Sequence, residues 1–356
     1  MMSKQYFINH LALFPITNST YDEKILYRPI ENTGEENFIE FLVYNGLAVI
    51  WSEYISQSQT KFVFNAELIE KLNREKLYSA AQLIRQKLIL YELHIIFEKN
   101  NIEYILFKGG DLRDTIYKHP ALRPVTDLDI LVPEQESKRA IKLLVDAGFE
   151  LNVKPENVSH ETNLIKDSVT IDLHWHILRP GRTRIELTSY LFRNKVINNH
   201  HWGLNPQASL AIMLIHPVIT KYLNSPVSML IHTVDLHFLI TKYDINWDEI
   251  EKIMSDAGTR KAAWCTLYWY KQMTGNSTIE KQLELFKPAF LNEIYLRFWI
   301  DHGLVQKLWN TRILIKIFFG LAIQDNLSDK INALINLLKE KNQSQTRLKE
   351  IIQLAQ

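Results

Sequence analysis

The spacing of apolar residues divides the chain into three parts. Up to residue 100, apolar side chains recur every three or four positions, which predicts helices over residues 36–58 and 65–100. Because a surface helix buries its apolar stripe, we expect the second helix to pack on the rest of the molecule through that stripe. The stripe consists of Leu77, Ala81, Ile84, Leu88, Tyr91 and Ile95.

Between residues 102 and 177 the pattern changes to short apolar runs and alternating residues, which are typical of β-strands. Strands are predicted at 104–107, 128–132, 163–165 and 169–177, and helices at 111–117 and 134–147. After Pro180 and Gly181 the helical period returns. Helices are predicted at 206–223 with a kink near Pro217, at 227–243, 247–254, 262–273, 279–285 and 291–308, and as a helical pair at 330–354.

This order of elements predicts an α+β fold, in which a small mixed β-sheet core is flanked by N-terminal and C-terminal helical regions. We expect a helical region over residues 1–100, the sheet-containing core over 101–180 and a second helical region over 181–356. A chain of 356 residues is long enough to bury a substantial hydrophobic core.

The composition excludes some partners and sites. The net charge is +1, from 41 basic and 40 acidic residues, so no overall field attracts a long nucleic acid. The single cysteine, Cys265, excludes an intramolecular disulfide, and we expect it to be a buried apolar side chain. No apolar run approaches the roughly 20 residues that a membrane-spanning helix needs. The N-terminal 30 residues mix charged and apolar side chains, unlike a secretory leader, so we expect a cytoplasmic protein.

Two aspartates, Asp127 and Asp129, are separated by one residue at the start of an apolar strand. Since strand residues alternate faces, the two carboxylates project together while Leu128 and Ile130 point to the other face. Carboxylates this close repel each other without a cation, and hard oxygen ligands favour Mg²⁺ or Mn²⁺, usually shared with phosphates. Alternatively, the pair caps a helix or lies on a solvated strand edge.

A lysine and two glycines, Lys108, Gly109 and Gly110, precede this pair and open a short predicted helix. Glycines let a phosphate approach the backbone closely, and helix N-termini bind phosphate oxygens through their N–H groups. Lys108 and Arg123 could neutralise a triphosphate as charge develops on its leaving group. Alternatively, the glycines form a simple turn, Lys108 ends a strand and Arg123 pairs with an aspartate.

A third carboxylate, Asp172, lies on the predicted strand 169–177, where it shares one face with His174 and His176. A polar face opposite an apolar one suits an active-site strand, and it also suits an amphipathic edge strand with a wet face. A zinc site at Asp172, His174 and His176 is disfavoured, because it would leave the other aspartates unexplained. We expect His174 to be a residue of the cleft.

Together these motifs resemble the DNA polymerase β-like nucleotidyltransferase superfamily and, within it, the bacterial uncharacterised nucleotidyltransferase family. The resemblance is close over residues 102–177. In one respect the chain departs from the pattern, because many superfamily members have Gly-Ser where this chain has Gly109-Gly110. The residues that carry the resemblance are Lys108-Gly109-Gly110, Arg123, Asp127-Leu128-Asp129 and Asp172-Leu173-His174-Trp175.

The resemblance implies transfer of a nucleoside monophosphate from an NTP to an acceptor with release of pyrophosphate, dependent on Mg²⁺ or Mn²⁺. It implies that Asp127 and Asp129 hold both metal ions, and that Asp172 holds the ion near the nucleophile and helps to deprotonate it. The residues expected to bind the nucleotide are Lys108, Gly109, Gly110, Arg123 and His174.

The acceptor is left open by the sequence. It could be a small molecule, a peptide, a protein side chain or an RNA end. A small molecule, a peptide or a protein is favoured over a long nucleic acid, and no membrane partner is expected. Two other functions also stay open. One is a non-catalytic descendant that binds a nucleotide or a partner protein, and the other is a toxin-like nucleotidyltransferase that acts on tRNA or on a protein.

Overall fold

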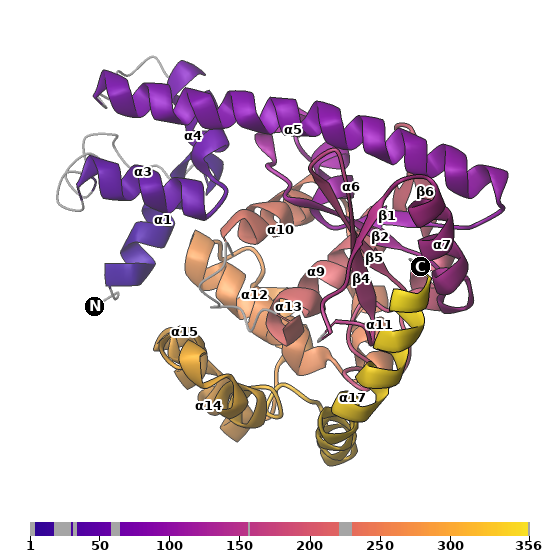
Figure 1. Ribbon diagram of the computed structural model, residues 1–356. Helices are drawn as coiled ribbons and strands as arrows, with labels where there is room; N and C mark the ends of the chain where they lie inside the picture. The colour runs from indigo at the N-terminus through magenta and orange to yellow at the C-terminus, as the bar shows by residue number, and fades with distance from the viewer. Residues whose placement is uncertain are drawn as a thin grey trace.

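A five-stranded mixed β-sheet lies between helical layers in the computed structural model, which describes residues 4–17, 30, 34–57, 65–155, 157–220 and 230–354 (Figure 1). Its strand order is β1-β2-β5-β4-β3; β2 and β5 are parallel, and the other neighbours are antiparallel. A separate hairpin pairs β6 with β7. The strands are β1 (Ile105–Phe107), β2 (Asp127–Leu131), β3 (Glu150–Asn152), β4 (Glu161–Lys166), β5 (Val169–His174), β6 (Lys195–Asn198) and β7 (His201–Leu204). The α+β class predicted from the sequence is confirmed.

Helices supply most of the remaining structure. Asparagine side chains begin several of them: Asn65, Asn246 and Asn326 each accept a hydrogen bond from a backbone N–H in the first turn. The helices are α1 (Lys4–Thr17), α3 (Glu35–Tyr44), α4 (Ala48–Gln57), α5 (Ala66–Lys99), α6 (Gly109–Thr115), α7 (Ser137–Asp146), α8 (Thr188–Arg193), α9 (Pro206–Thr220), α10 (Leu230–Lys242), α11 (Trp247–Ala257), α12 (Arg260–Thr274), α13 (Glu280–Phe286), α14 (Phe290–Asp301), α15 (Leu304–Lys307), α16 (Arg312–Leu314) and α17 (Leu327–Gln353). None of these described helices combines the length and the hydrophobicity that crossing a lipid bilayer requires.

The two faces of the sheet bury different sets of apolar residues. On one face, Leu128, Ile130 and Leu173 pack with residues of α5 and α7. On the other face, Phe107 and Leu131 join the larger core formed with helices of the C-terminal part, including α9, α10 and α12. The predicted burial of Cys265 is confirmed, because this residue lies within the larger core. Helices thus cover both sides of the sheet.

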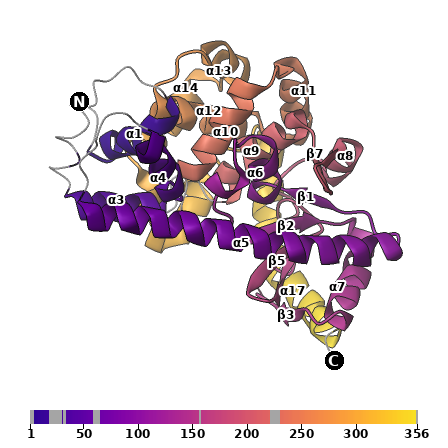
Figure 2. The ribbon, with the colours of Figure 1, turned by 90° about the horizontal axis from the view of Figure 1, so that it is seen from above.

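The long helix α5, which runs across the molecule in Figure 2, packs through a different face from the one that the sequence predicted. Leu77, Ile84, Leu88 and Tyr91 are exposed, at 71%, 62%, 66% and 64%. The buried face instead includes two polar residues, which satisfy backbone carbonyls: Ser79 donates to Ala121 O and Gln86 to Val125 O. Periodicity of apolar residues missed this face because polar side chains complete it. The buried face comprises Leu72, Ser79, Gln86, Ile89, Leu90, Leu93 and Phe97.

The C-terminal helix α17 is one continuous helix, so the predicted helical pair at 330–354 is wrong. Its last turns return to the sheet: Ile351 is buried with the apolar face of the strands, and Lys138 of α7 pairs with Glu350 at 3.0 Å. The Arg347 guanidinium lies 4.6 Å from the centre of the Trp175 ring. The end of the chain is therefore part of the sheet's cover.

Glycines explain two further differences from the predicted helices. The helix predicted over 36–58 is broken into α3 and α4 at Gly46, whose φ is +72°, and residue 58 lies outside the described residues. Gly303, with a φ of +58°, likewise separates α14 from α15 within the predicted helix 291–308. Strand β3 and the β6–β7 hairpin were not predicted, because their runs of three or four residues are too short to stand out. Residues 221–229, at the ends of two predicted helices, also lie outside the described residues.

Candidate functional site

Parallel pairing of β2 with β5 brings the predicted aspartates together. Asp129 lies opposite Asp172, and Asp127 opposite Thr170. Leu128 and Ile171 point to the other face, where they are fully buried. The alternation predicted for these strands is therefore present, and the carboxylates of Asp129 and Asp172 share one face of the sheet.

Asp129, Asp172 and His174 offer ligand atoms that all lie within 4.8 Å of one another, among the residues that the structure describes. His174 Nε2 lies 3.0 Å from Asp129 Oδ1. Asp127 is one step away along β2, where its Oδ1 accepts a hydrogen bond of 2.6 Å from the Thr126 hydroxyl. The closest set of donors thus contains His174 in addition to two of the three predicted aspartates.

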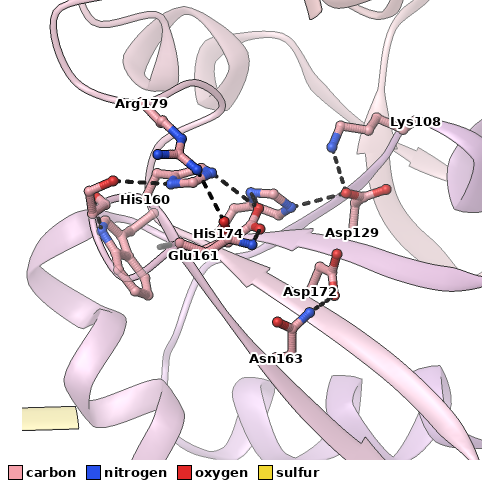
Figure 3. Close-up of polar contacts among 11 residues, drawn as sticks. Lys108, Asp129, His160, Glu161, Asn163, Asp172, His174 and Arg179 are labelled. Carbon is pink, nitrogen blue, oxygen red and sulfur yellow. Dashed lines mark hydrogen bonds and ion pairs between the residues drawn. The ribbon is translucent and has the colours of Figure 1, made fainter. Parts of the chain in front are cut away.

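Lys108 reaches into this cluster, with its Nζ 2.6 Å from Asp129 Oδ1 (Figure 3). Burial alone would raise the pKa of Asp129, but the Lys108 charge and the His174 contact outweigh it and hold this pKa below its ordinary value. The backbone of Lys108 has a φ of +53°, a conformation that costs free energy for a residue with a side chain. Such strain is concentrated at functional sites, where the surrounding structure enforces it.

Within the part of the chain that the structure describes, Asp172 has no cationic partner of this kind. Its Oδ1 accepts a hydrogen bond from Asn163 Nδ2. Burial, followed by the charges of Asp127, Asp129 and Glu161, raises the pKa of Asp172 to about 8. The site therefore carries more negative charge than Lys108 balances.

Glu161, on the adjacent strand β4, completes the cluster and was not found from the sequence. Its Oε2 lies 3.1 Å from His174 Nδ1 and 3.5 Å from His160 Nε2 (Figure 3). The His174 ring is thus held between Asp129 and Glu161. Burial lowers the pKa of His160 to about 2, so this ring is neutral. The predicted strand began at residue 163. A period of two residues, continued backwards from Asn163, would have extended this strand to include Glu161.

Protein side chains occupy the space beside the glycine turn. A Cβ on Gly109 would come within 2.9 Å of Arg123 Nη2, and a Cβ on Gly110 would come within 2.9 Å of Leu106 Cδ1. Both glycines are buried at the start of α6. Close packing against Arg123 and Leu106 is therefore one physical reason for glycine at these two positions.

Arg123 is paired with Asp235 of α10. The alternative interpretation from the sequence was that Arg123 pairs with an aspartate, but it did not say which one. Its Nη2 donates to Asp235 Oδ2 at 2.8 Å, and its Nε donates to Asp235 Oδ1 at 2.9 Å. Tyr117 also donates its hydroxyl to Asp235 Oδ1, at 2.6 Å. Asp235 is fully buried and Arg123 is 7% exposed. This arginine holds the loop before β2 against the C-terminal helices.

His176 does not extend the cleft face of β5, because the strand ends at His174. His176 instead lies 3.4 Å from Glu134 and 3.2 Å from Glu186. On a strand that continued to residue 177, Ile177 would share the apolar face of Leu173, but the two residues belong to different core clusters. The alternating zinc triad of Asp172, His174 and His176 is therefore not formed.

The donor set suits a hard divalent cation. Asp129 and Asp172 supply carboxylate oxygens, which Mg²⁺ and Mn²⁺ prefer, and His174 adds an imidazole nitrogen. A cation between the carboxylates would relieve the repulsion that raises the pKa of Asp172. Lys108, which now balances Asp129, would then be free to meet another anion.

Comparisons with known proteins identify one family. Residues 31–275 match the model of a family described as "Uncharacterised nucleotidyltransferase". No curated protein matches the chain, and no solved structure does. The match extends well beyond the motifs of residues 102–177, into the helices on both sides, and it supports a nucleotidyltransferase role at the level of the family.

Proposed function

The chain belongs to the uncharacterised nucleotidyltransferase family, and on that premise we propose that it transfers a nucleoside monophosphate from an NTP to an acceptor. The reaction depends on Mg²⁺ or Mn²⁺. The observation that carries this proposal is the surplus of carboxylates around Asp129 and Asp172, next to Lys108, whose side chain is 12% exposed. Such an arrangement is costly for the fold and suits a site that binds a cation together with phosphates.

In this reaction an acceptor oxygen forms a bond to the α-phosphorus of the NTP, and the bond from that phosphorus to the bridging oxygen breaks. Pyrophosphate leaves, and the proton of the acceptor passes to Asp172. Asp127, Asp129 and Asp172 would hold the divalent cation. The chemistry that the bound cation supplies is polarisation of phosphoryl oxygens and a lower pKa for the acceptor hydroxyl.

Lys108 and His174 have supporting roles in this proposal. Lys108 Nζ, which contacts Asp129 at 2.6 Å, would pair with phosphate oxygens once the cation neutralises that carboxylate. His174, held by Glu161 on one side, keeps the Asp129 carboxylate oriented on the other. Gly109 and Gly110 would bring the start of α6 close to the phosphates. Arg123 would act from behind this turn, by packing against Gly109.

The acceptor in this proposal is a small molecule, a peptide or a protein. The net charge of +1 supports this class, since a long nucleic acid is usually met by a strongly basic surface.

The proposal is tested by titrating ATP, GTP, CTP and UTP into the protein by calorimetry, with and without Mg²⁺. We expect tight binding of at least one nucleotide only in the presence of the metal. Asp146→Asn, which changes an exposed aspartate of α7, is the matched control and should bind like the unaltered protein. Equally weak binding of all four nucleotides in both conditions would contradict the proposal.

A further inference from the structure

The exposed stripe of α5 has the spacing of a coiled-coil seam. Its apolar positions are separated alternately by four and three residues, which is the heptad spacing that packs against one other helix. Four of them are more than 60% exposed, and at 100° per residue the stripe lies on the side of α5 opposite its buried residues. The six positions are Leu77, Ala81, Ile84, Leu88, Tyr91 and Ile95.

A groove continues this seam at its C-terminal half. It has a volume of about 670 Å³ and lies between α5 and the β6–β7 hairpin. Tyr91 and His94 line one wall, and Ile197 and Trp202 line the other. Ile197 is itself 65% exposed. The apolar surface available to a second helix is therefore wider than the stripe alone.

The order of residues along the seam is self-complementary about a two-fold axis at the level of Gln86. In an antiparallel pair, this axis places Ile84 opposite the partner subunit's Leu88 and Leu77 opposite the partner subunit's Ile95. It also places Ala81, the smallest side chain of the seam, opposite the partner subunit's Tyr91, the largest. The smallest side chain of the seam then faces the largest, and the other pairs join aliphatic residues of equal size, which favours close packing.

The charges at the two ends of the seam match in the same register. Continuing the heptad one step in each direction reaches Arg74 and Glu98, both exposed. The antiparallel arrangement sets Arg74 opposite the partner subunit's Glu98 at each end. A parallel arrangement would set Arg74 against arginine and Glu98 against glutamate, which is unfavourable.

We propose that this chain forms a homodimer through α5, with the two helices antiparallel and related by a two-fold axis near Gln86. The interface is isologous, so each subunit contributes the same surface. It goes beyond the proposed nucleotidyl transfer and does not depend on it, because none of its residues belongs to the acidic cluster of β2 and β5.

The first test measures the mass of the full chain by sedimentation velocity over a range of concentrations. We expect a dimer, and at least about a hundredfold weaker association for Leu88→Glu, because this change buries a charge in each helix of the pair. The matched control is Leu291→Glu on α14, where the leucine is 78% exposed, and this variant should dimerise normally. A monomer at every concentration, or a dimer that Leu88→Glu leaves intact, would overturn the proposal.

The second test determines the direction of the helices. Arg74→Glu and Glu98→Lys should each weaken association about tenfold, and the double variant should restore it, because opposite charges again face each other at both ends. Only an antiparallel pair predicts this rescue. Failure of the double variant to recover would overturn the antiparallel arrangement.

Cysteine cross-linking tests the same register directly. The single native cysteine, Cys265, is buried, so an introduced cysteine is the one expected to react. A mixture of Ala81→Cys and Tyr91→Cys proteins should form a disulfide between subunits under mild oxidation. Efficient cross-linking of Ala81→Cys with itself would show parallel helices and overturn the proposal. If the chain is monomeric instead, a helix of another protein becomes the occupant to seek.

Discussion

Asp129 and Asp235 each form an ion pair inside the protein, with Lys108 and with Arg123, and the surroundings of the two pairs differ. The buried arginine site consists of Arg123, Asp235 and Tyr117, in which one positive charge meets one negative charge through three hydrogen bonds from the guanidinium. The acidic site consists of Asp127, Asp129, Asp172 and Glu161 around Lys108. There, Lys108 balances Asp129, while Asp172 has its pKa raised to about 8 by burial and by its acidic neighbours.

This difference in charge balance indicates which of the two sites stabilises the fold. A balanced and fully bonded pair can be stable as it stands, although it becomes costly if one partner is removed. A surplus of like charge costs free energy in the folded protein and is tolerated where a ligand uses it. By this criterion the buried arginine site has the features of a structural pair, and the acidic site has the features expected of the functional site proposed above.

The largest expected effect is on nucleotidyl transfer. Asp172→Asn should reduce transfer from labelled NTP by at least about 10⁴-fold, because it removes the carboxylate proposed to receive the acceptor proton. Binding of magnesium-bound NTP should be mostly kept, since Asp127 and Asp129 are unchanged and one negative charge has left a crowded site. Asp127→Asn and Asp129→Asn should lose both binding and transfer. Transfer and binding are measured side by side, after circular dichroism shows that each variant is folded.

A fully active Asp172→Asn protein would remove Asp172 from the proposed mechanism. The third carboxylate would then be sought at Glu161, whose Oε2 contacts His174 at 3.1 Å. Glu161→Gln tests that alternative in the same assay.

The next effect is on stability. Asp235→Asn should lower the free energy of unfolding by about 3–5 kcal/mol, because it leaves Arg123 buried without a balancing charge. Replacing both residues by leucine should cost less than this single change, since no uncompensated charge stays behind. The measurement is urea unfolding followed by circular dichroism. Asp146→Asn, in an exposed pair with Lys142, is the control and should change stability by no more than about 0.5 kcal/mol. An Asp235→Asn protein as stable as this control would show that the pair is not a structural requirement.

Much of the acidic site could be predicted from the sequence, because it depends on local alternation. Asp127, Asp129 and Asp172 lie on strands, and a period of two residues is enough to place each carboxylate on the polar face. The parallel pairing that sets Asp129 opposite Asp172 brings together residues far apart in the chain, and no local pattern determines it. Glu161 and Asn163 reach the site through the antiparallel pairing of β4 with β5, on a strand whose beginning was predicted two residues late.

The partner of Arg123 could not be predicted, because Asp235 is more than a hundred residues away on an apolar helix. On sequence alone, an aspartate among buried leucines gives no indication of which cation balances it. For α5, the sequence located an apolar stripe but did not show which face of the helix is buried. The buried face includes Ser79 and Gln86, which donate hydrogen bonds to backbone carbonyls. Hydrophobic periodicity does not detect such polar residues.

The two sites should also respond to pH with opposite signs. The pKa of Asp235 is lowered in the folded protein because Arg123 outweighs burial, so its stabilisation is present above the ordinary aspartate pKa and is lost as the pH falls. The pKa of Asp172 is raised from 3.8 to about 8, so this residue destabilises the fold increasingly as the pH rises through that interval. Asp172→Asn should therefore stabilise the metal-free protein by at least about 2 kcal/mol near pH 8, and by only about 0.5 kcal/mol near pH 4. Urea unfolding in chelator at both pH values measures this. A gain that is the same at both would show that the Asp172 charge is not its cause.

The smallest effect concerns the pH dependence of metal binding. A cation bound at Asp129 and Asp172 requires both carboxylates to be ionised, so binding must release the proton that Asp172 holds below its raised pKa of about 8. The affinity for Mg²⁺ should then rise about tenfold for each pH unit between about pH 6 and pH 8, and level off above that range. Asp235→Asn should keep this slope, because the pKa of Asp235 is lowered and its carboxylate is already ionised throughout. Calorimetry in buffers of different ionisation enthalpy counts the released proton directly. An affinity that does not change with pH would mean that the cation binds without Asp172, and the contrast between the two sites would then rest on Asp127 and Asp129 alone.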